Sequence, residues 1–145
     1  GPNARFFRAN AQAFGQRIDR AMQRWTQAMA PFSGAKVASY HATFNYLLRR
    51  FGIASIGYLE DRPGIPPSPS HLVDLIGRMR EAHVSVILHE AFYDRASSDL
   101  VGGRAGARVL VLPISVGGAA GVTSYEQLID HIIGQLVAAL GQRPS

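Results

Sequence analysis

From Lys36 onward the sequence alternates between short apolar strands and amphipathic helices, and this alternation repeats four times. The predicted strands are rich in Val, Ile and Leu and cover residues 36–41, 54–60, 84–90 and 108–113. The helical patterns that follow them cover residues 42–51, 69–83, 94–103 and 124–140. Buried strands separated by helices are typical of a parallel sheet with helices on both faces. We therefore predict an α/β fold built on a four-stranded parallel sheet.

A long amphipathic helix over residues 4–30 is predicted ahead of this unit. Its apolar residues recur at spacings of three and four from Phe7 to Met29, which gives one apolar stripe. Pro31 and the Ser33-Gly34 pair end the helix. We expect residues 1–34 to form this helix and residues 35–145 to form the α/β lobe. The stripe is expected to pack against the lobe, with a coiled-coil partner as the alternative.

Composition limits the classes of function. The chain has 145 residues, 47% of them hydrophobic, no cysteine and a net charge of +5, which fits one compact domain without disulfides or thiolate metal sites. The sequence shows neither a signal peptide nor an apolar run of the roughly 18 residues that a membrane span needs. The arginines of the first helix alternate with its apolar stripe, which favours a solvated helix face over a nucleic-acid interface.

Several polar residues stand at the ends of the predicted strands. Right-handed crossovers bring the carboxyl ends of parallel strands to one edge of the sheet, where ligands bind. The residues expected at this edge are His41, Glu60 with Asp61, His89 with Glu90, and Ser115. Imidazoles and carboxylates suit zinc or manganese, although the carboxylates could instead cap loop amides. We expect His71 and His83 to lie on the surface and His131 to be packed at the edge of the last helix.

An enzyme is the alternative to a metal-binding protein. His41 would then act as acid or base, with Glu60 or Glu90 as its partner. The sequence has no Gly-x-Ser-x-Gly elbow and no phosphate-binding lysine loop, and its glycine-rich segment 102–106 precedes a strand instead of following one. No serine or cysteine is placed as a nucleophile for His41, so we assign no catalytic residue.

His41 lies in the segment YHATFNY, residues 40–46, which is followed by RFG at 50–52. This segment resembles the histidine segment of the extracytoplasmic zinc and manganese receptors of ABC importers, the ZnuA/TroA-like solute-binding proteins. The resemblance continues in the same order through residues 64–72, 86–90 and 123–125. The opening helix, from Asn10 onward, is similar to the latter part of the helix that joins the two lobes of these receptors. The similarity spans nearly the whole chain.

The resemblance implies a specific metal site. Family members hold the metal between two α/β lobes, and this chain would be the C-terminal lobe alone. His41 matches the metal ligand of that lobe, and Glu90 matches a carboxylate of the second shell. Glu60 and Ser115 are further candidates for the second shell or for additional ligands. The segment 112–115 has no carboxylate where the family often supplies an aspartate, so the resemblance favours Zn²⁺, with Mn²⁺ as the alternative.

The resemblance also implies partners and a compartment. We expect an extracytoplasmic protein without catalytic activity that binds a divalent metal, works with an N-terminal lobe absent from this sequence, and serves a membrane permease. Its signal peptide would also lie outside this sequence. Because only His41 matches a ligand of the family, the chain by itself is expected to bind zinc weakly or not at all. Absence of the other lobe would uncover Phe6, Phe7 and Phe14 and favour a homodimer.

Overall fold

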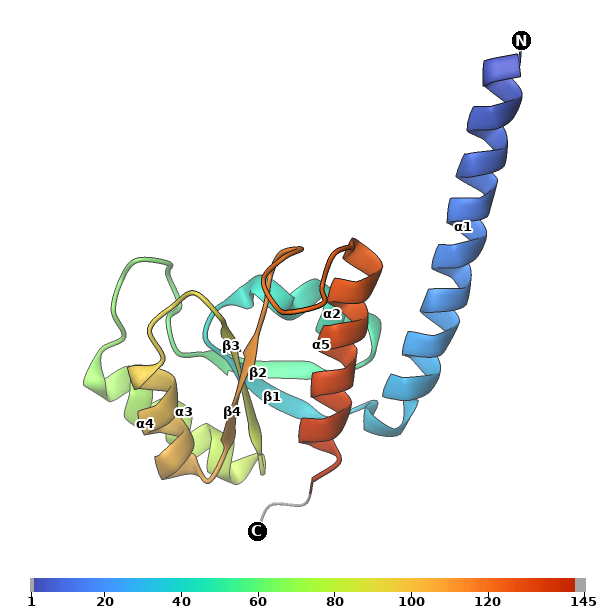
Figure 1. Cartoon of the computed structure of the whole chain (residues 1–145). Coiled ribbons are helices and arrows are strands. Elements are labelled where there is room, and N and C mark those ends of the chain that lie inside the picture. The colour runs from blue at the N-terminus through green and yellow to red at the C-terminus, as the bar shows by residue number, and fades with distance from the viewer. Residues whose placement is uncertain (1, 143–145) are drawn as a thin grey trace.

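The chain forms an α/β unit with one long additional helix, seen in a computed structural model that describes residues 2–142 (Figure 1). The helices are α1 (Pro2–Met29), α2 (Asn45–Arg50), α3 (Pro69–Glu81), α4 (Ala96–Ala105) and α5 (Tyr125–Leu140), with short 3-10 helices η1 (Ala30–Phe32) and η2 (Ala42–Phe44). The strands are β1 (Lys36–Ser39), β2 (Ala54–Tyr58), β3 (Val86–Glu90) and β4 (Arg108–Leu112). None of the helices described is long and apolar enough to span a membrane.

The predicted parallel sheet is confirmed. Its strands pair in parallel in the order β2-β1-β3-β4. Helices α1, α2 and α5 cover one face and α3 and α4 cover the other (Figure 1). Side chains alternate between the two faces along each strand. Val86 and Leu88 of β3 therefore pack in the core under α1, α2 and α5, whereas Ile87 packs in the core under α3 and α4.

The strand order creates a crevice beside β1. The chain passes from β1 to β2 on one side, then returns across β1 to β3 on the other. In open α/β sheets, ligands bind at the carboxyl ends of the strands where the order reverses in this way. His41 follows β1 by two residues and Glu90 ends β3. The topology therefore places these two residues on either side of the switch point.

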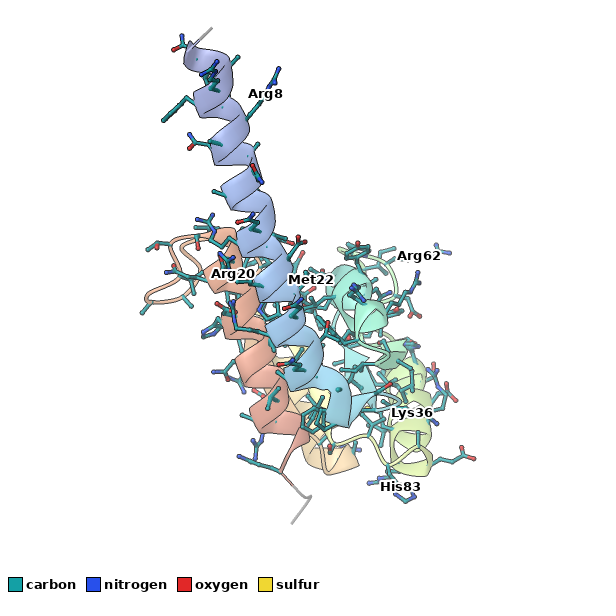
Figure 2. All side chains as sticks on the ribbon, turned by 90° about the vertical axis from the view of Figure 1, so that its right-hand side faces the viewer. Arg8, Arg20, Met22, Lys36, Arg62 and His83 are labelled. Atoms are coloured by element: carbon teal, nitrogen blue, oxygen red, sulfur yellow. The ribbon has the colours of Figure 1, made fainter. Side chains whose placement is uncertain are left out.

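Helix α1 packs on the lobe along only part of its length. Ala21, Trp25 and Met29 are buried in the core shared with α5, as the stripe predicts. Phe6, Phe7 and Phe14 are 64%, 68% and 56% exposed. The stripe therefore packs on the lobe only in its C-terminal half, and its N-terminal half is uncovered, as expected for a lobe without its partner. This half extends past the end of α5, and Figure 2 shows it standing clear at Arg8, whereas the part around Met22 lies against the lobe.

The boundaries of several elements differ from the prediction. Strand β1 ends at Ser39 and leaves His41 in an extended link to η2. Helix α3 ends at Glu81, and His83 follows in a left-handed conformation with φ of 54°. The cap of α5 is Ser124, whose hydroxyl accepts the backbone N–H of Gln127. Glu126, two positions after this cap, contacts Arg17 and Arg24 of α1.

Candidate functional site

His41 stands between two carboxylates. Its Nε2 lies 3.2 Å from Oε1 of Glu60, and its Nδ1 lies 3.3 Å from Oε1 of Glu90. The three residues come from the ends of β1, β2 and β3, and all are buried, with His41 6% and Glu60 7% exposed. The structure thus brings together three of the polar residues predicted at this edge of the sheet.

Glu90 is held on the Nδ1 side of the histidine ring. The hydroxyl of Thr43 donates to Glu90 Oε1 at 2.6 Å, and the Glu90 side chain is almost completely buried. A carboxylate lies beside each ring nitrogen, but Nε2 makes no hydrogen bond to Glu60. The neutral tautomer with its proton on Nδ1, beside Glu90, therefore keeps a lone pair on Nε2. Among residues 2–142, His41 Nε2 and Glu90 Oε2 are buried without a hydrogen-bond partner.

Glu60 is held on the Nε2 side. The Tyr40 hydroxyl donates to its Oε2 at 2.7 Å, and the backbone N–H of Gly64 donates to its Oε1. Gly64 has φ of +83°, a conformation that glycine adopts without strain. Burial raises the pKa of Glu60, but the bond from Tyr40, the contact with His41 and the bond from Gly64 outweigh it, so the pKa is lowered. Glu60 is therefore a carboxylate at neutral pH.

Two tyrosine rings pack against the His41 imidazole. The Tyr93 ring meets the imidazole edge-on at 4.7 Å between centroids, and Tyr40 lies 4.5 Å away. His89, predicted at the open edge, is instead fully buried. Its Nδ1 is 2.9 Å from the Ser98 hydroxyl and its Nε2 is 3.2 Å from the Tyr93 carbonyl. Through these two contacts, His89 of β3 holds the loop that carries Tyr93 and the start of α4 that carries Ser98.

The remaining predicted residues lie apart from the cluster of His41, Glu60 and Glu90. Asp61 is exposed and faces His71 at 3.6 Å. His71 was predicted on the surface but is half-buried, because its Nε2 lies 2.7 Å from the Tyr58 carbonyl. Ser115 is exposed in the loop after β4, and within residues 2–142 no hydrogen bond joins its side chain to the cluster. His83 is exposed, and His131 is half-buried on α5.

Sequence reasoning missed the residues that hold the two carboxylates. Tyr40 and Thr43 flank His41 in the sequence, so their closeness to it was a usable signal. Tyr93 lies three residues beyond Glu90, in a loop whose path the pattern does not indicate. Gly64 lies in a proline-rich loop, and its backbone N–H leaves no trace in residue type. These contacts depend on tertiary structure.

The cluster offers two donor atoms to an ion. In the part of the chain that the structure describes, no three His, Asp or Glu side chains form a complete metal site. His41 Nε2 and Glu60 Oε1 face the same side of the imidazole, whereas Glu90 faces the other. Two surface hollows of about 430 and 410 Å³ lie beside α2, and neither is lined by these residues. Two donor atoms are fewer than the roughly three that an open zinc site takes from protein.

The Tyr40–Glu60 bond predicts an alkaline loss of stability. Burial and the bond to Glu60 raise the pKa of Tyr40 to about 12. Because the folded pKa exceeds the unfolded value of about 10, the stabilisation is complete below pH 10 and is lost as pH rises through 12. Urea unfolding at pH 8 should give Tyr40→Phe a free energy of unfolding about 1–2 kcal/mol below that of wild type. At pH 11.5 this difference in free energy should be smaller. An equal gap at both pH values would contradict this assignment.

One protein-family model and several solved structures match this chain. The family model described as "ZnuA: Zinc-uptake complex component A periplasmic" matches residues 2–139. No curated protein sequence matches the chain. Among solved structures, the chain is similar to the solute-binding protein FpvC of Pseudomonas aeruginosa in complex with Mn²⁺, at 27% identity and a TM-score of 0.73. That match covers 92% of this chain and 50% of FpvC.

Two further structures share the fold. One is the Cd-bound periplasmic metal-binding protein of Candidatus Liberibacter asiaticus, at 21% identity and a TM-score of 0.79, covering 95% of this chain and 53% of that one. The other is a ZnuA crystal structure, at 21% identity and a TM-score of 0.75, covering 92% of this chain and 49% of that one. The chain thus spans about half the length of the solved structures that it matches.

Proposed function

Because the chain belongs to the ZnuA family of zinc-uptake components, we propose that it is the C-terminal lobe of a metal receptor of an ABC importer. In this proposal His41 coordinates the cargo ion through Nε2. The family consists of transport components, so it gives no support to the alternative of an enzyme that uses His41 as acid or base. The receptor works in the periplasm and delivers its ion to a membrane permease.

The unpartnered Nε2 of His41 is the observation that carries this proposal. A buried polar atom without a hydrogen bond is costly and calls for an explanation. Here the atom lies at the switch point of the sheet, and the other ring nitrogen faces Glu90. A carboxylate behind a histidine orients the ring and raises its basicity toward a metal, as in carboxylate–histidine–zinc triads. We assign this orienting role to Glu90.

Zinc is the proposed cargo. An imidazole ligand suits Zn²⁺, and the β4 end has buried Leu112 and Pro113 where a carboxylate would favour Mn²⁺. The related structures are complexes with Mn²⁺, Cd²⁺ or Ni²⁺, so the binding experiment compares ions directly. Because protons compete with the metal for the imidazole, affinity should fall in acid.

We further propose that a second lobe completes the site. Zinc takes about four ligands, and open sites use about three from protein. The chain spans about half of the related structures, which leaves room in them for a second lobe with more donors. The uncovered Phe7 and Phe14 of α1 suit contact with such a lobe. The comparisons give no support to the homodimer expected from the same exposed helix.

Calorimetric titration of this chain with Zn²⁺ and Mn²⁺ tests the proposal. We expect weak zinc binding, in the range of micromolar to millimolar dissociation constants, and weaker binding of manganese. His41→Ala should lower the zinc affinity at least tenfold, a loss of about 1.4 kcal/mol or more. The matched control is His83→Ala, which removes an exposed histidine and should leave the zinc affinity unchanged. Submicromolar zinc binding that survives His41→Ala would disprove the role of His41.

A further inference from the structure

The separation between His41 Nε2 and Glu60 Oε1 is that of two neighbouring ligands of one ion. Donors about 2.1 Å from a zinc ion lie about 3.0 Å apart at a right angle and about 3.4 Å apart at the tetrahedral angle. The observed distance of 3.2 Å falls between these limits. At that distance Nε2 still has no hydrogen-bond partner in the described chain, so the two atoms lie side by side rather than donor to acceptor. An ion could therefore contact both.

On this basis, and resting on the proposed function, we propose that Glu60 is a direct metal ligand, coordinating through Oε1 beside His41 Nε2. Glu60 lies at the end of β2, outside the histidine segment and away from β4. It supplies from a different strand the carboxylate that residues 112–115 lack. The lobe then contributes one nitrogen and one oxygen donor.

The surroundings of Glu60 support a ligand role. The Tyr40 hydroxyl donates a hydrogen bond to Oε2 and fixes the orientation of the carboxylate. The backbone N–H of Gly64, in the loop after β2, donates a hydrogen bond to Oε1. An oxygen atom can accept this bond and still present a lone pair to an ion. Such outer contacts position metal ligands in proteins. Glu60 therefore needs little rearrangement to bind.

Glu90 is excluded from the same role by its position. Its Oε1 faces Nδ1, on the other side of the ring, and accepts a hydrogen bond from the Thr43 hydroxyl. The two glutamates are thus distinguished by geometry: Glu60 stands beside the ion and Glu90 behind the histidine. A carboxylate in place of a second imidazole makes the donor set harder, so the Glu60 ligand should narrow the preference of the site for zinc over manganese.

Difference infrared spectroscopy with zinc titration can test this assignment on the 145-residue chain. Zinc should shift carboxylate stretching bands of the wild type and of Glu90→Gln, but not of Glu60→Gln. Zinc affinity should fall about tenfold or more in Glu60→Gln. Glu60→His should keep zinc affinity within about tenfold and lose Mn²⁺ binding. The matched control is Glu126→Gln, which removes a carboxylate of α5 remote from the cluster.

The outcomes separate this inference from the proposed function. Wild-type affinity and unchanged bands in Glu60→Gln, with binding lost in His41→Ala, would overturn the Glu60 ligand and leave the His41 role intact. Retention of zinc binding in His41→Ala would overturn the His41 role itself. Absence of saturable zinc binding in the wild type would contradict both the Glu60 ligand and the weak binding expected through His41. Circular dichroism confirms that each variant is folded.

Discussion

Trp25→Ala is expected to destabilise the fold by about 3–5 kcal/mol, the usual cost of truncating a buried aromatic residue. The Trp25 side chain is 6% exposed in the core between α1 and α5. Its indole N–H donates to Asp130 at 2.6 Å, so the substitution also removes the hydrogen bond that ties α1 to α5. The nearby contacts of Arg17 and Arg24 with Glu126 are exposed, and such ion pairs contribute little.

Urea unfolding followed by circular dichroism measures this effect, since Trp25 is the only tryptophan and its fluorescence is lost in the variant. The matched control is Phe14→Ala, on the same helix but 56% exposed. We expect its free energy of unfolding to stay within about 0.5 kcal/mol of wild type. Equal losses in the two variants would contradict the finding that only the C-terminal half of α1 packs on the lobe.

The sequence predicted the sheet because its strands are buried on both faces. A parallel strand covered by helices must be apolar at successive positions, and Val86-Ile87-Leu88 shows this directly. The helix of residues 4–30 was also correctly placed, since its apolar period is that of an α-helix. That period does not reveal how much of a helix is covered. Phe7 and Trp25 occupy the same stripe, yet the fold buries only Trp25. Helix α5 begins at Tyr125, and its second residue, Glu126, already pairs with Arg17, so α5 does not extend alongside Phe7 (Figure 1).

The cluster could be predicted only in part, for a related reason. A residue after a strand is certain to lie near the crevice, which brought His41, Glu60 and Glu90 into consideration together. Whether its side chain points into the crevice depends on which face of the sheet the residue lies on, because successive side chains alternate between the faces. It also depends on the path of the loop that follows the strand. His89 and Glu90 are neighbours on β3 and so point to opposite faces: Glu90 meets His41, whereas His89 meets Ser98. No local pattern gives the loop that brings Gly64 back to Glu60.

Glu90→Leu is expected to cost about 1–3 kcal/mol, because it leaves the buried His41 imidazole and the Thr43 hydroxyl without their acceptor. Thr43 donates to Glu90 Oε1 at 2.6 Å, and His41 Nδ1 lies 3.3 Å from the same atom. The carboxylate is almost completely buried, so water cannot readily replace it. Leucine fills a similar volume and leaves little cavity. The loss therefore measures polar pairing rather than packing.

Urea unfolding at neutral pH without metal gives this value, and Glu90→Gln is the matched control. Glutamine has nearly the same shape and its amide oxygen still accepts from Thr43, so we expect it to lose less than half as much stability as Glu90→Leu. Zinc titration adds a second readout: both variants should bind zinc more weakly, by about 10–100-fold, because the histidine loses its orienting carboxylate. Unchanged stability in Glu90→Leu would mean that this buried carboxylate does not support the histidine. The metal-binding role of His41 would then depend on its position at the sheet edge alone.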